Sequence, residues 1–482
     1  MANKLNCKLG SLPMKYLGIP VSDAHLGTTA FGGLFEKMNK RLEPWKGKHL
    51  SSGGKLTLTN SCLSSLPMYI MGFYWLTGAT HSKMDSIRAN FFWKGVEKSH
   101  KYHMAKWEMV SCPKDQGGLG IINTRLMNDC LLVKWIWKIM KGSEGVWFKL
   151  LQAKYMRNGK SFFTSSSRGS SQFWQGLHKV KHLFKWGALF KVKDGEKVSL
   201  WEDSWVNDSP LKHQFPSLYA FCEDPLATIA DCWQDGEWDV NFRRTFSEED
   251  MQLWEELLTV LHGVAMDSSQ SDEVMWMLDK SRSFATKSMY RFLTFGGVTS
   301  KEAGGIWKAR VPLKIKVFIW QMFHKLPTAT ELVKRGWKGS HRCSLCGQPE
   351  SGDHIFFHCS MARFTWCCLR DFFGWDGHPT SCSDFWGRWL PLKFNISPRL
   401  GIFMFAGLCW VLWITRNKMA FEQKFINKPT EVVFLGINFM QKWSPMLKED
   451  DREKVEGVLK TVTNWLQNLP TSGAPVLDIV EI

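Results

Sequence analysis

The chain has 482 residues and a formal charge of +17, with 44% hydrophobic and 22% charged residues. This composition excludes an intrinsically disordered protein, and the length allows roughly three domains with cores of their own. Two uncharged stretches do not predict a membrane span, because residues 56–82 are interrupted by polar side chains and residues 400–415 are too short. We therefore expect a buried helix at 400–415 and no membrane partner.

The positive charge is unevenly distributed. Residues 1–200 contain 31 Lys and Arg against 11 Asp and Glu, whereas residues 201–300 contain 7 against 18. Residues 301–400 are basic again, with 15 against 7. A basic block of this size attracts polyanions through counterion release, whatever their sequence. RNA or DNA is therefore a candidate partner, and a solvated basic surface is the alternative.

Helical periodicity dominates the chain, so the predicted fold class is mainly α with minor β. Within residues 124–141, apolar side chains recur at three- and four-residue steps, which places them on one helix face. Asn123 or Thr124 can cap this helix, and Gly142 can end it. The Ser- and Gly-rich residues 161–176 predict a loop.

Two further helices are predicted after the Gly-containing linker at 296–305. One begins at Pro312, because the missing N–H of proline costs nothing in a first helical turn. The next begins at Thr328, where Glu331 would complete a capping box. Short strands are expected at 197–201 and 283–286. The inward stripe of the first helix is predicted to consist of Ile315, Phe318, Ile319, Met322 and Phe323.

The strongest chemical motif consists of Cys343, Cys346, His354 and Cys359, with the spacing C-x2-C-x7-H-x4-C. Two thiolates two residues apart can bind one Zn²⁺ from a tight turn, and a His and a third Cys complete a tetrahedron. Four protein ligands leave no open position, so the predicted cofactor is one structural Zn²⁺ ion. His358 could replace His354, although two adjacent ligands bind one tetrahedral ion awkwardly.

The cysteines also bear on the cellular compartment. The chain has 13 cysteines, an odd number, and its first residues lack the continuous apolar core of a secretory signal. We therefore expect an intracellular, reducing location, either nuclear or cytoplasmic, where clustered cysteines are read as metal ligands before disulfides. The alternative for the motif is four reduced, buried side chains without a metal.

Short motifs rich in aromatic, basic and glycine residues follow one another along the chain. The first group comprises residues 15–20 (KYLGIP), 45–51 (WKGKHLS), 66–69 (LPMY), 91–95 (FFWKG), 117–121 (GGLGI) and 201–205 (WEDSW). The second group comprises Trp307, Pro312, Trp320, Arg335 and Trp366 around the cysteine motif, followed by Arg416 and Asn417. In this order the motifs resemble the C-terminal part of a plant LINE-type (non-LTR) retrotransposon reverse transcriptase, including its reverse-transcriptase zinc-binding domain.

The resemblance implies four regions. Residues 1–150 would be a thumb-like helical region that follows the polymerase palm, and residues 151–283 a Trp-rich spacer, basic and then acidic. Residues 284–372 would be the zinc-binding domain, a small zinc knuckle, and residues 373–482 a C-terminal helical region. The implied partners are RNA or DNA and, as a further candidate, another retroelement polypeptide, with no small-molecule substrate.

The resemblance and the local charge together suggest nucleic-acid-binding residues. Lys46 and Lys48 lie within the first Trp-containing motif, and Lys338 and Arg342 lie beside the cysteine motif. Lys55 stands where the family usually has Arg, so it keeps the charge but loses the bidentate fork. We expect these five side chains to contact phosphates, which gives affinity without sequence choice.

Catalysis is not expected from the chain by itself. Reverse transcriptases need adjacent aspartates on a hairpin to hold two metal ions. The one Asp-Asp pair, Asp450-Asp451, lies in a charged, helix-like run and predicts a solvated face. The chain begins where the palm of the family ends, so it resembles a truncated element or a split gene. The alternatives to nucleic-acid binding are a protein-interaction or assembly module and a non-functional relic.

Overall fold

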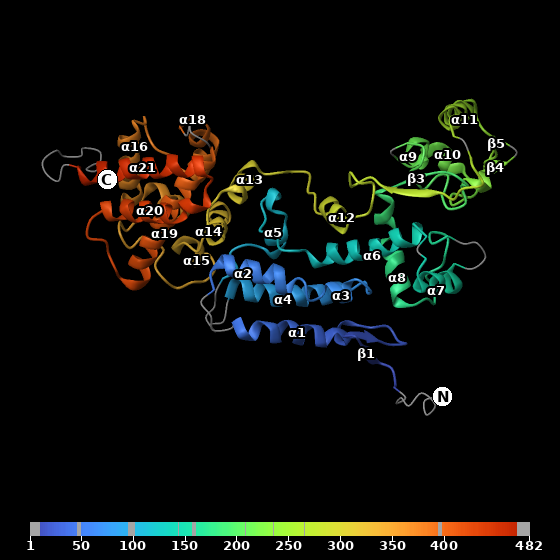
Figure 1. Ribbon diagram of the computed structural model, residues 1–482, viewed down its shortest axis with the longest axis horizontal. Helices are drawn as coiled ribbons and strands as arrows, with labels where there is room; N and C mark the ends of the chain where they lie inside the picture. Colours follow the sequence, from blue (N-terminus) through green and yellow to red (C-terminus); the bar gives the residue numbers. More distant parts are fainter. Residues whose placement is uncertain are drawn as a thin grey trace. The chain divides into compact units, whose positions relative to one another are not determined.

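The computed structural model describes residues 10–45, 50–94, 102–142, 144–156, 161–207, 209–234, 236–264, 266–393 and 398–469 (Figure 1). Helices account for most of these residues, and the strands form three separate two-stranded sheets among them. The predicted fold class, mainly α with minor β, is confirmed.

The described residues form two compact units, each assembled from separate stretches of the chain. Unit 1 comprises Met1–Phe35, Leu66–Ser82 and Asn123–Phe295, and unit 2 comprises Glu36–Ser65, Lys83–Ile122 and Gly296–Ile482. The division after residues 150, 283 and 372, which was implied by resemblance, stays a prediction.

Unit 1 contains short helices and all three sheets. Its helices are α3 (Met68–Met71), α6 (Thr124–Met140), α7 (Val146–Tyr155), α8 (Gln172–Lys185), α9 (Leu211–Gln214), α10 (Pro216–Phe221), α11 (Glu248–Leu261) and α12 (Thr286–Leu293). Its strands are β1 (Met14–Tyr16), β2 (Ile19–Val21), β3 (Ala188–Lys191), β4 (Trp233–Gln234), β5 (Glu237–Trp238) and β6 (Glu273–Trp276). Helices α1 (Gly32–Leu42) and α4 (Gly78–Lys94) each contribute residues to both units.

The two predicted strands, 197–201 and 283–286, are wrong. The pairing instead joins β3 and β6 antiparallel, with Ala188 opposite Trp276, and β1–β2 and β4–β5 are likewise antiparallel. The loop after β3 is held by the buried carboxylate of Asp272, which accepts the backbone N–H groups of Lys193, Gly195 and Lys197 at 2.7–3.0 Å. Because a side chain satisfies these donors, Lys197 lies outside any strand, and the pairing within 197–201 is limited to an isolated antiparallel bridge between Ser199 and Thr228.

Tryptophan and asparagine side chains organise the interior of unit 1. Trp174, Trp201 and Trp276 are fully buried, so the abundance of Trp reflects packing here. Asn128 on α6 accepts the N–H of Leu76 at 2.8 Å and donates to two carbonyl groups of the preceding segment. Asn123 caps α6 as predicted, because its Oδ1 accepts the N–H groups of the first turn.

Unit 2 consists mainly of helices. They are α2 (Ser52–Leu58), α5 (Trp107–Ser111), α13 (Lys301–Lys308), α14 (Leu313–His324), α15 (Ala329–Val333), α16 (Ser360–Phe373), α17 (Cys382–Asp384), α18 (Leu390–Lys393), α19 (Pro398–Glu422), α20 (Thr430–Trp443) and α21 (Glu449–Gln467). Wider, π-type turns are η4 (Thr59–Leu63), η7 (His354–His358) and η8 (Phe385–Trp389). A 3-10 turn, η5 (Lys114–Gln116), precedes the glycine motif.

Helix α19 is the centre of the larger core of unit 2. Within the described residues it is the one helix whose length and composition would suit a membrane crossing, and 72% of its most apolar stretch is buried in the protein. Phe403, Phe405 and Leu412 are buried in this core. The predicted buried helix at 400–415 is therefore confirmed.

Helix α14 is buried on two faces, where the sequence predicted one. Ile315, Phe318 and Ile319 pack into the same core as α19, as expected. Val317 and Trp320 belong to a second cluster with Leu56, Phe92 and Leu119, which come from the N-terminal half of the chain. The predicted single stripe was incomplete because segments distant in sequence cover the other face of the helix.

The capping box predicted at Thr328 forms only in part. Thr328 Oγ1 accepts the N–H of Glu331 at 3.4 Å, as a capping residue should. The Glu331 carboxylate does not turn back to the backbone, because it pairs with Lys334 at 2.8 Å and Arg335 at 3.1 Å.

Candidate metal centre

The first two ligands of the predicted zinc site lie in a tight turn. The N–H of Cys343 donates to the carbonyl of Gln348 at 2.7 Å, and the N–H of Gly347 donates back to Cys343 at 3.0 Å. Gly347 has φ +71°, a left-handed conformation that glycine adopts without strain. This turn brings the side chains of Cys343 and Cys346 to the same side of the chain.

The other two ligands come from the start of a helix. His354 opens turn η7, and the N–H of Cys359 closes that turn on the His354 carbonyl at 2.6 Å. Cys359 is also the N-cap residue of α16. The positive end of the α16 dipole therefore favours a thiolate at this position.

The four predicted ligands meet at one point. The Sγ atoms of Cys343, Cys346 and Cys359 and a ring nitrogen of His354 all lie within 4.8 Å of one another. Sγ of Cys343 and Sγ of Cys359 are 3.9 Å apart, and Sγ of Cys346 is 3.3 Å from Nε2 of His354. Zn–S bonds of about 2.3 Å in a tetrahedron would separate two sulfurs by about 3.8 Å. The donor set and its spacing fit one structural Zn²⁺ ion.

The thiols also interact with one another. A hydrogen bond from Cys359 lowers the pKa of Cys343 to about 3, and the same contact raises the pKa of Cys359. Two sulfurs that share one proton already carry a negative charge between them. A divalent cation would replace the remaining thiol protons, and with three thiolates and one neutral imidazole the complex would carry one negative charge.

The structure separates the two candidate histidines. His354 is buried and points its Nε2 at Cys346, whereas His358 is exposed and lines a neighbouring pocket. His354 therefore joins the three thiols and His358 does not. Among the described residues, this is the one place where three or more potential metal ligands gather. The twelve described cysteines are all free thiols.

A buried ion pair behind the metal centre was missed by the sequence reasoning. Arg416 on α19 donates from Nε to Glu350 Oε2 at 2.8 Å, and its Nη2 also bonds Glu350 Oε1. Glu350 also accepts the N–H of Ala329 at 2.9 Å, at the start of α15. This pair joins the zinc loop (residues 341–359) to two helices. The sequence signal is a lone charge, Arg416, directly after the apolar run at 400–415.

Part of the N-terminal half packs onto the zinc-binding region within unit 2. The carbonyl of Gly117 accepts hydrogen bonds from Trp320 Nε1 at 2.6 Å and His324 Nε2 at 3.0 Å. Arg335 donates to the carbonyl of Met104 at 3.3 Å. A Cβ on Gly53 would lie 2.7 Å from the backbone nitrogen of Lys314, so α2 and α14 are in direct backbone contact. These contacts place the motif at 117–121 and helix α2 against α14.

The predicted nucleic-acid-binding residues lie in different settings. Lys46 and Lys48 fall outside the described residues. Lys55 lies on α2 and is half-buried, while Lys338 is exposed on the loop before the zinc ligands. Arg342 is exposed too, but its Nη1 donates to the carbonyl of Gly347 at 3.0 Å, so it also braces the cysteine turn.

A basic cleft in unit 2 was not predicted. It measures about 530 Å³ and lies where residues 103–109 meet the end of α14 and Arg335. None of its described lining residues is acidic, and seven of them are basic or aromatic: His103, Lys106, Trp107, Phe323, His324, Lys325 and Arg335. The signal was hidden because the two halves of the cleft are more than 200 residues apart in the sequence.

The fold and the site define a helical domain with a Cys3His metal centre. Comparisons with known proteins agree with this class. Residues 284–366 match the family described as zinc-binding in reverse transcriptase. A putative ribonuclease H protein of Arabidopsis thaliana is 27% identical over 363 residues, which cover 72% of this chain and 57% of that protein. An uncharacterized mitochondrial protein of the same plant is 27% identical over 149 residues, 30% of this chain and 97% of that protein.

These findings confirm the resemblance drawn from the motifs. Residues 284–366 match the zinc-binding domain of reverse transcriptases, and Cys343, Cys346, His354 and Cys359 within them are suited to one structural zinc ion. The matched region spans about half the length of the putative ribonuclease H protein.

Proposed function

We propose that the chain is a non-catalytic, nucleic-acid-binding part of a LINE-type reverse transcriptase. The observation that carries this proposal is the basic cleft, because it combines cations from the N-terminal half and from the zinc-binding region in one concave surface. Cations along a groove neutralise phosphates, and aromatic side chains among them can stack on bases.

The charge balance of the cleft supports an anionic ligand. Glu331 pairs with two cations that line the cleft, Lys325 at 3.7 Å and Arg335 at 3.1 Å, and with Lys334 at 2.8 Å, which lies outside the lining. The hydrogen bond from Lys334 lowers the pKa of Glu331, which is therefore ionised at neutral pH. One negative charge against three positive charges leaves a surplus, to which exposed Lys106 adds. That surplus favours a polyanion over a neutral partner.

The non-catalytic part of the proposal is supported by the one Asp-Asp pair in the sequence. Asp450 and Asp451 lie in the first turn of α21, where carboxylates interact favourably with the helix dipole. Asp450 is exposed and Asp451 is half-buried. The interaction with the helix dipole accounts for both side chains without a catalytic metal.

The test is the salt dependence of binding. A fluorescent 20-nucleotide RNA and a matching duplex DNA are titrated with the purified chain by anisotropy, at salt concentrations from about 50 to 200 mM. We expect the affinity to fall steeply over this range. In Lys106→Gln/Lys325→Gln the slope of log affinity against log salt should drop by about 2. Lys424→Gln, which removes an exposed lysine paired with Glu422, is the matched control and should leave the slope unchanged.

A salt-independent affinity of the unaltered chain would contradict the proposal. An equal loss of slope in the control variant would also contradict it. The salt dependence would then reflect the total charge of the chain and not the position of the lysines in the cleft.

A further inference from the structure

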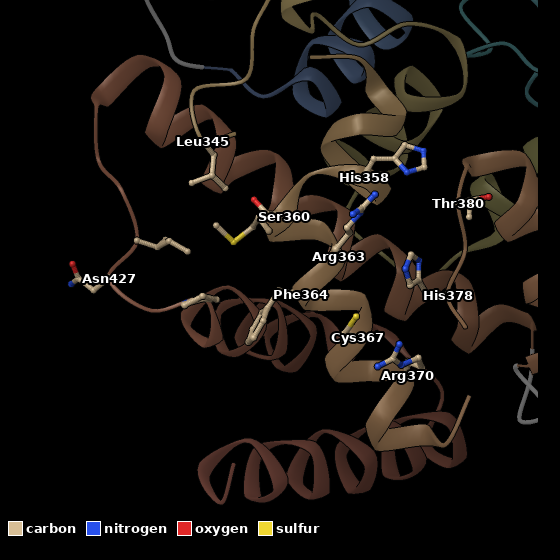
Figure 2. A pocket seen from close by; sticks show the side chains of 13 residues that line it. Leu345, His358, Ser360, Arg363, Phe364, Cys367, Arg370, His378, Thr380 and Asn427 are labelled. Carbon is tan, nitrogen blue, oxygen red and sulfur yellow. The ribbon is translucent and has the colours of Figure 1, made fainter. Parts of the chain in front are cut away.

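A second pocket lies directly beside the metal centre, outside the basic cleft. It measures about 610 Å³, which is within the usual range for small-ligand sites. Its wall consists of one face of α16, the loop before α17, the segment before α20, and two residues of the zinc loop, Leu345 and His358 (Figure 2). Bound zinc would therefore hold part of this wall in place.

The pocket has a basic side. Arg363 and Arg370 lie on α16 and, with His358 and His378, gather on the same side in Figure 2. None of the described lining residues is acidic. Arg363 is exposed and forms no ion pair within the described part of the chain, while Arg370 Nε donates to exposed Asp371 at 2.9 Å. His378 donates from Nδ1 to the carbonyl of Pro379 at 3.1 Å, which leaves Nε2 as its second polar atom.

The opposite side of the pocket is apolar. Leu345 and Phe364 lie there, away from the basic side chains (Figure 2). The lining also includes apolar Met361, Ile426 and Pro429 and polar Ser360 and Asn427. Phe364 is half-buried, so one part of its ring packs on the core while the rest faces the pocket. A flat aromatic group could stack on this ring while an attached anion reached the arginines.

The spacing of the arginines distinguishes a chain of phosphates from a single anion. Arg363 and Arg370 are seven residues apart on α16, which is about 10 Å along the helix axis. Arginines placed at this interval along one helix suit successive phosphates of a strand, each of which can meet one guanidinium.

From this arrangement we infer that the pocket binds an unpaired nucleotide of single-stranded RNA or DNA, with its base on Phe364 and its flanking phosphates on Arg363 and Arg370. The inference rests on the proposed function and adds a specific site to it. Stacking of this kind tolerates any base, so the site selects unpaired strands over duplexes and not one sequence over another.

The experiment uses the zinc-loaded full chain and a hexanucleotide that contains one 2-aminopurine, whose fluorescence falls on stacking. We expect quenching on binding, and about tenfold weaker binding in Arg363→Gln, the loss of one charged phosphate contact. Phe364→Leu should weaken binding about tenfold and abolish the quenching. Phe364→Trp should bind as tightly as the unaltered chain and keep the quenching. Arg388→Gln removes an exposed arginine outside the pocket and is the matched control. Zinc content and far-UV circular dichroism establish that each variant is folded.

Several outcomes would overturn the inference. If long RNA binds with steep salt dependence but the pocket variants behave like Arg388→Gln, the inference fails and the proposed function stands. If Phe364→Leu is neutral and inorganic phosphate competes as well as a mononucleotide, the site holds a bare anion. If an acidic peptide of equal charge displaces the hexanucleotide as well as an unlabelled hexanucleotide does, the pocket fits a protein partner. If no nucleic acid binds the unaltered chain, both proposals fail.

Discussion

Arg416 and Glu350 form a bidentate ion pair that is nearly inaccessible to water, with side-chain exposures of 10% and 2%. The two residues are 66 positions apart, one on the long apolar helix α19 and the other in the zinc loop. Glu350 also accepts the first N–H of α15. The metal centre is thus connected to the helical core by a charged contact as well as by apolar packing.

Removing one member of this pair should be costly. Arg416→Met leaves the Glu350 carboxylate buried without its partner, so we expect the free energy of unfolding to fall by about 3–5 kcal/mol. The measurement is urea unfolding of the zinc-loaded chain at neutral pH. Arg452→Met, which breaks the exposed pair of Arg452 with Glu449, is the control and should cost at most about 1 kcal/mol. Similar losses in the two variants would show that the buried pair contributes no more to the free energy of unfolding than the exposed pair does.

Two adjacent glycines on α2 should respond oppositely to the same substitution. In Gly53→Ala the new methyl group would lie 2.7 Å from the backbone of α14, so we expect a loss of about 1–3 kcal/mol in unfolding free energy. In Gly54→Ala the atom nearest to the new methyl group would be 3.6 Å away. Because alanine has less conformational entropy than glycine in the unfolded chain, we expect a gain of up to about 1 kcal/mol in unfolding free energy. Urea titrations followed by tryptophan fluorescence compare the two. Equal effects would mean that α2 does not pack on α14.

Histidine substitutions should separate the ligand from its neighbour. His354→Ala removes the nitrogen that faces Cys346, so the chain should lose its zinc to a chromophoric chelator far more readily than the unaltered protein. His358→Ala should keep one zinc ion, because this exposed side chain points into the adjacent pocket. If the His358 variant loses zinc and the His354 variant keeps it, His354 is not the ligand.

Asp129 makes the stability of unit 1 fall with rising pH, the opposite of the effect of a carboxyl group whose pKa is lowered on folding. Burial raises the pKa of Asp129 to about 6, although a hydrogen bond from Trp75 Nε1 at 3.1 Å partly opposes the shift. Between about pH 4, where an unfolded aspartate titrates, and pH 6, the folded chain holds the extra proton. Stability therefore falls as the pH rises through this window, and the loss persists at pH 7.

Asp129→Asn should remove this penalty and still accept the Trp75 hydrogen bond. We expect the variant to be more stable than the unaltered chain by about 1 kcal/mol at pH 7, a value discounted for partial exposure, and equally stable at pH 4. Thermal unfolding of both proteins at the two pH values gives the comparison. A gain that is the same at pH 4 and pH 7 would show that ionisation of Asp129 is not its source.

The sequence predicted those features that depend on neighbouring residues. The ligand spacing from Cys343 to Cys359, the Asn123 cap and the buried character of 400–415 are local patterns, and each has its counterpart in the structure. Helix starts at Pro312 and Thr328 were placed within a residue for the same reason.

Features that depend on residues distant in the sequence could not be predicted from local patterns. The β3–β6 pairing joins strands about 80 residues apart, and Asp272 satisfies backbone donors that the sequence suggested for a strand. The second buried face of α14, at Val317 and Trp320, exists only because N-terminal residues cover it. The two pockets likewise combine segments whose proximity no periodicity encodes.

X-ray absorption at the zinc edge is the decisive test of whether Cys343, Cys346, His354 and Cys359 bind one structural zinc ion. The purified chain should contain one zinc per molecule, with three sulfur ligands at about 2.3 Å and one nitrogen ligand at about 2.0–2.1 Å. A chain that is folded without zinc, or a zinc ion surrounded by oxygen or by fewer than three sulfur atoms, would contradict the account.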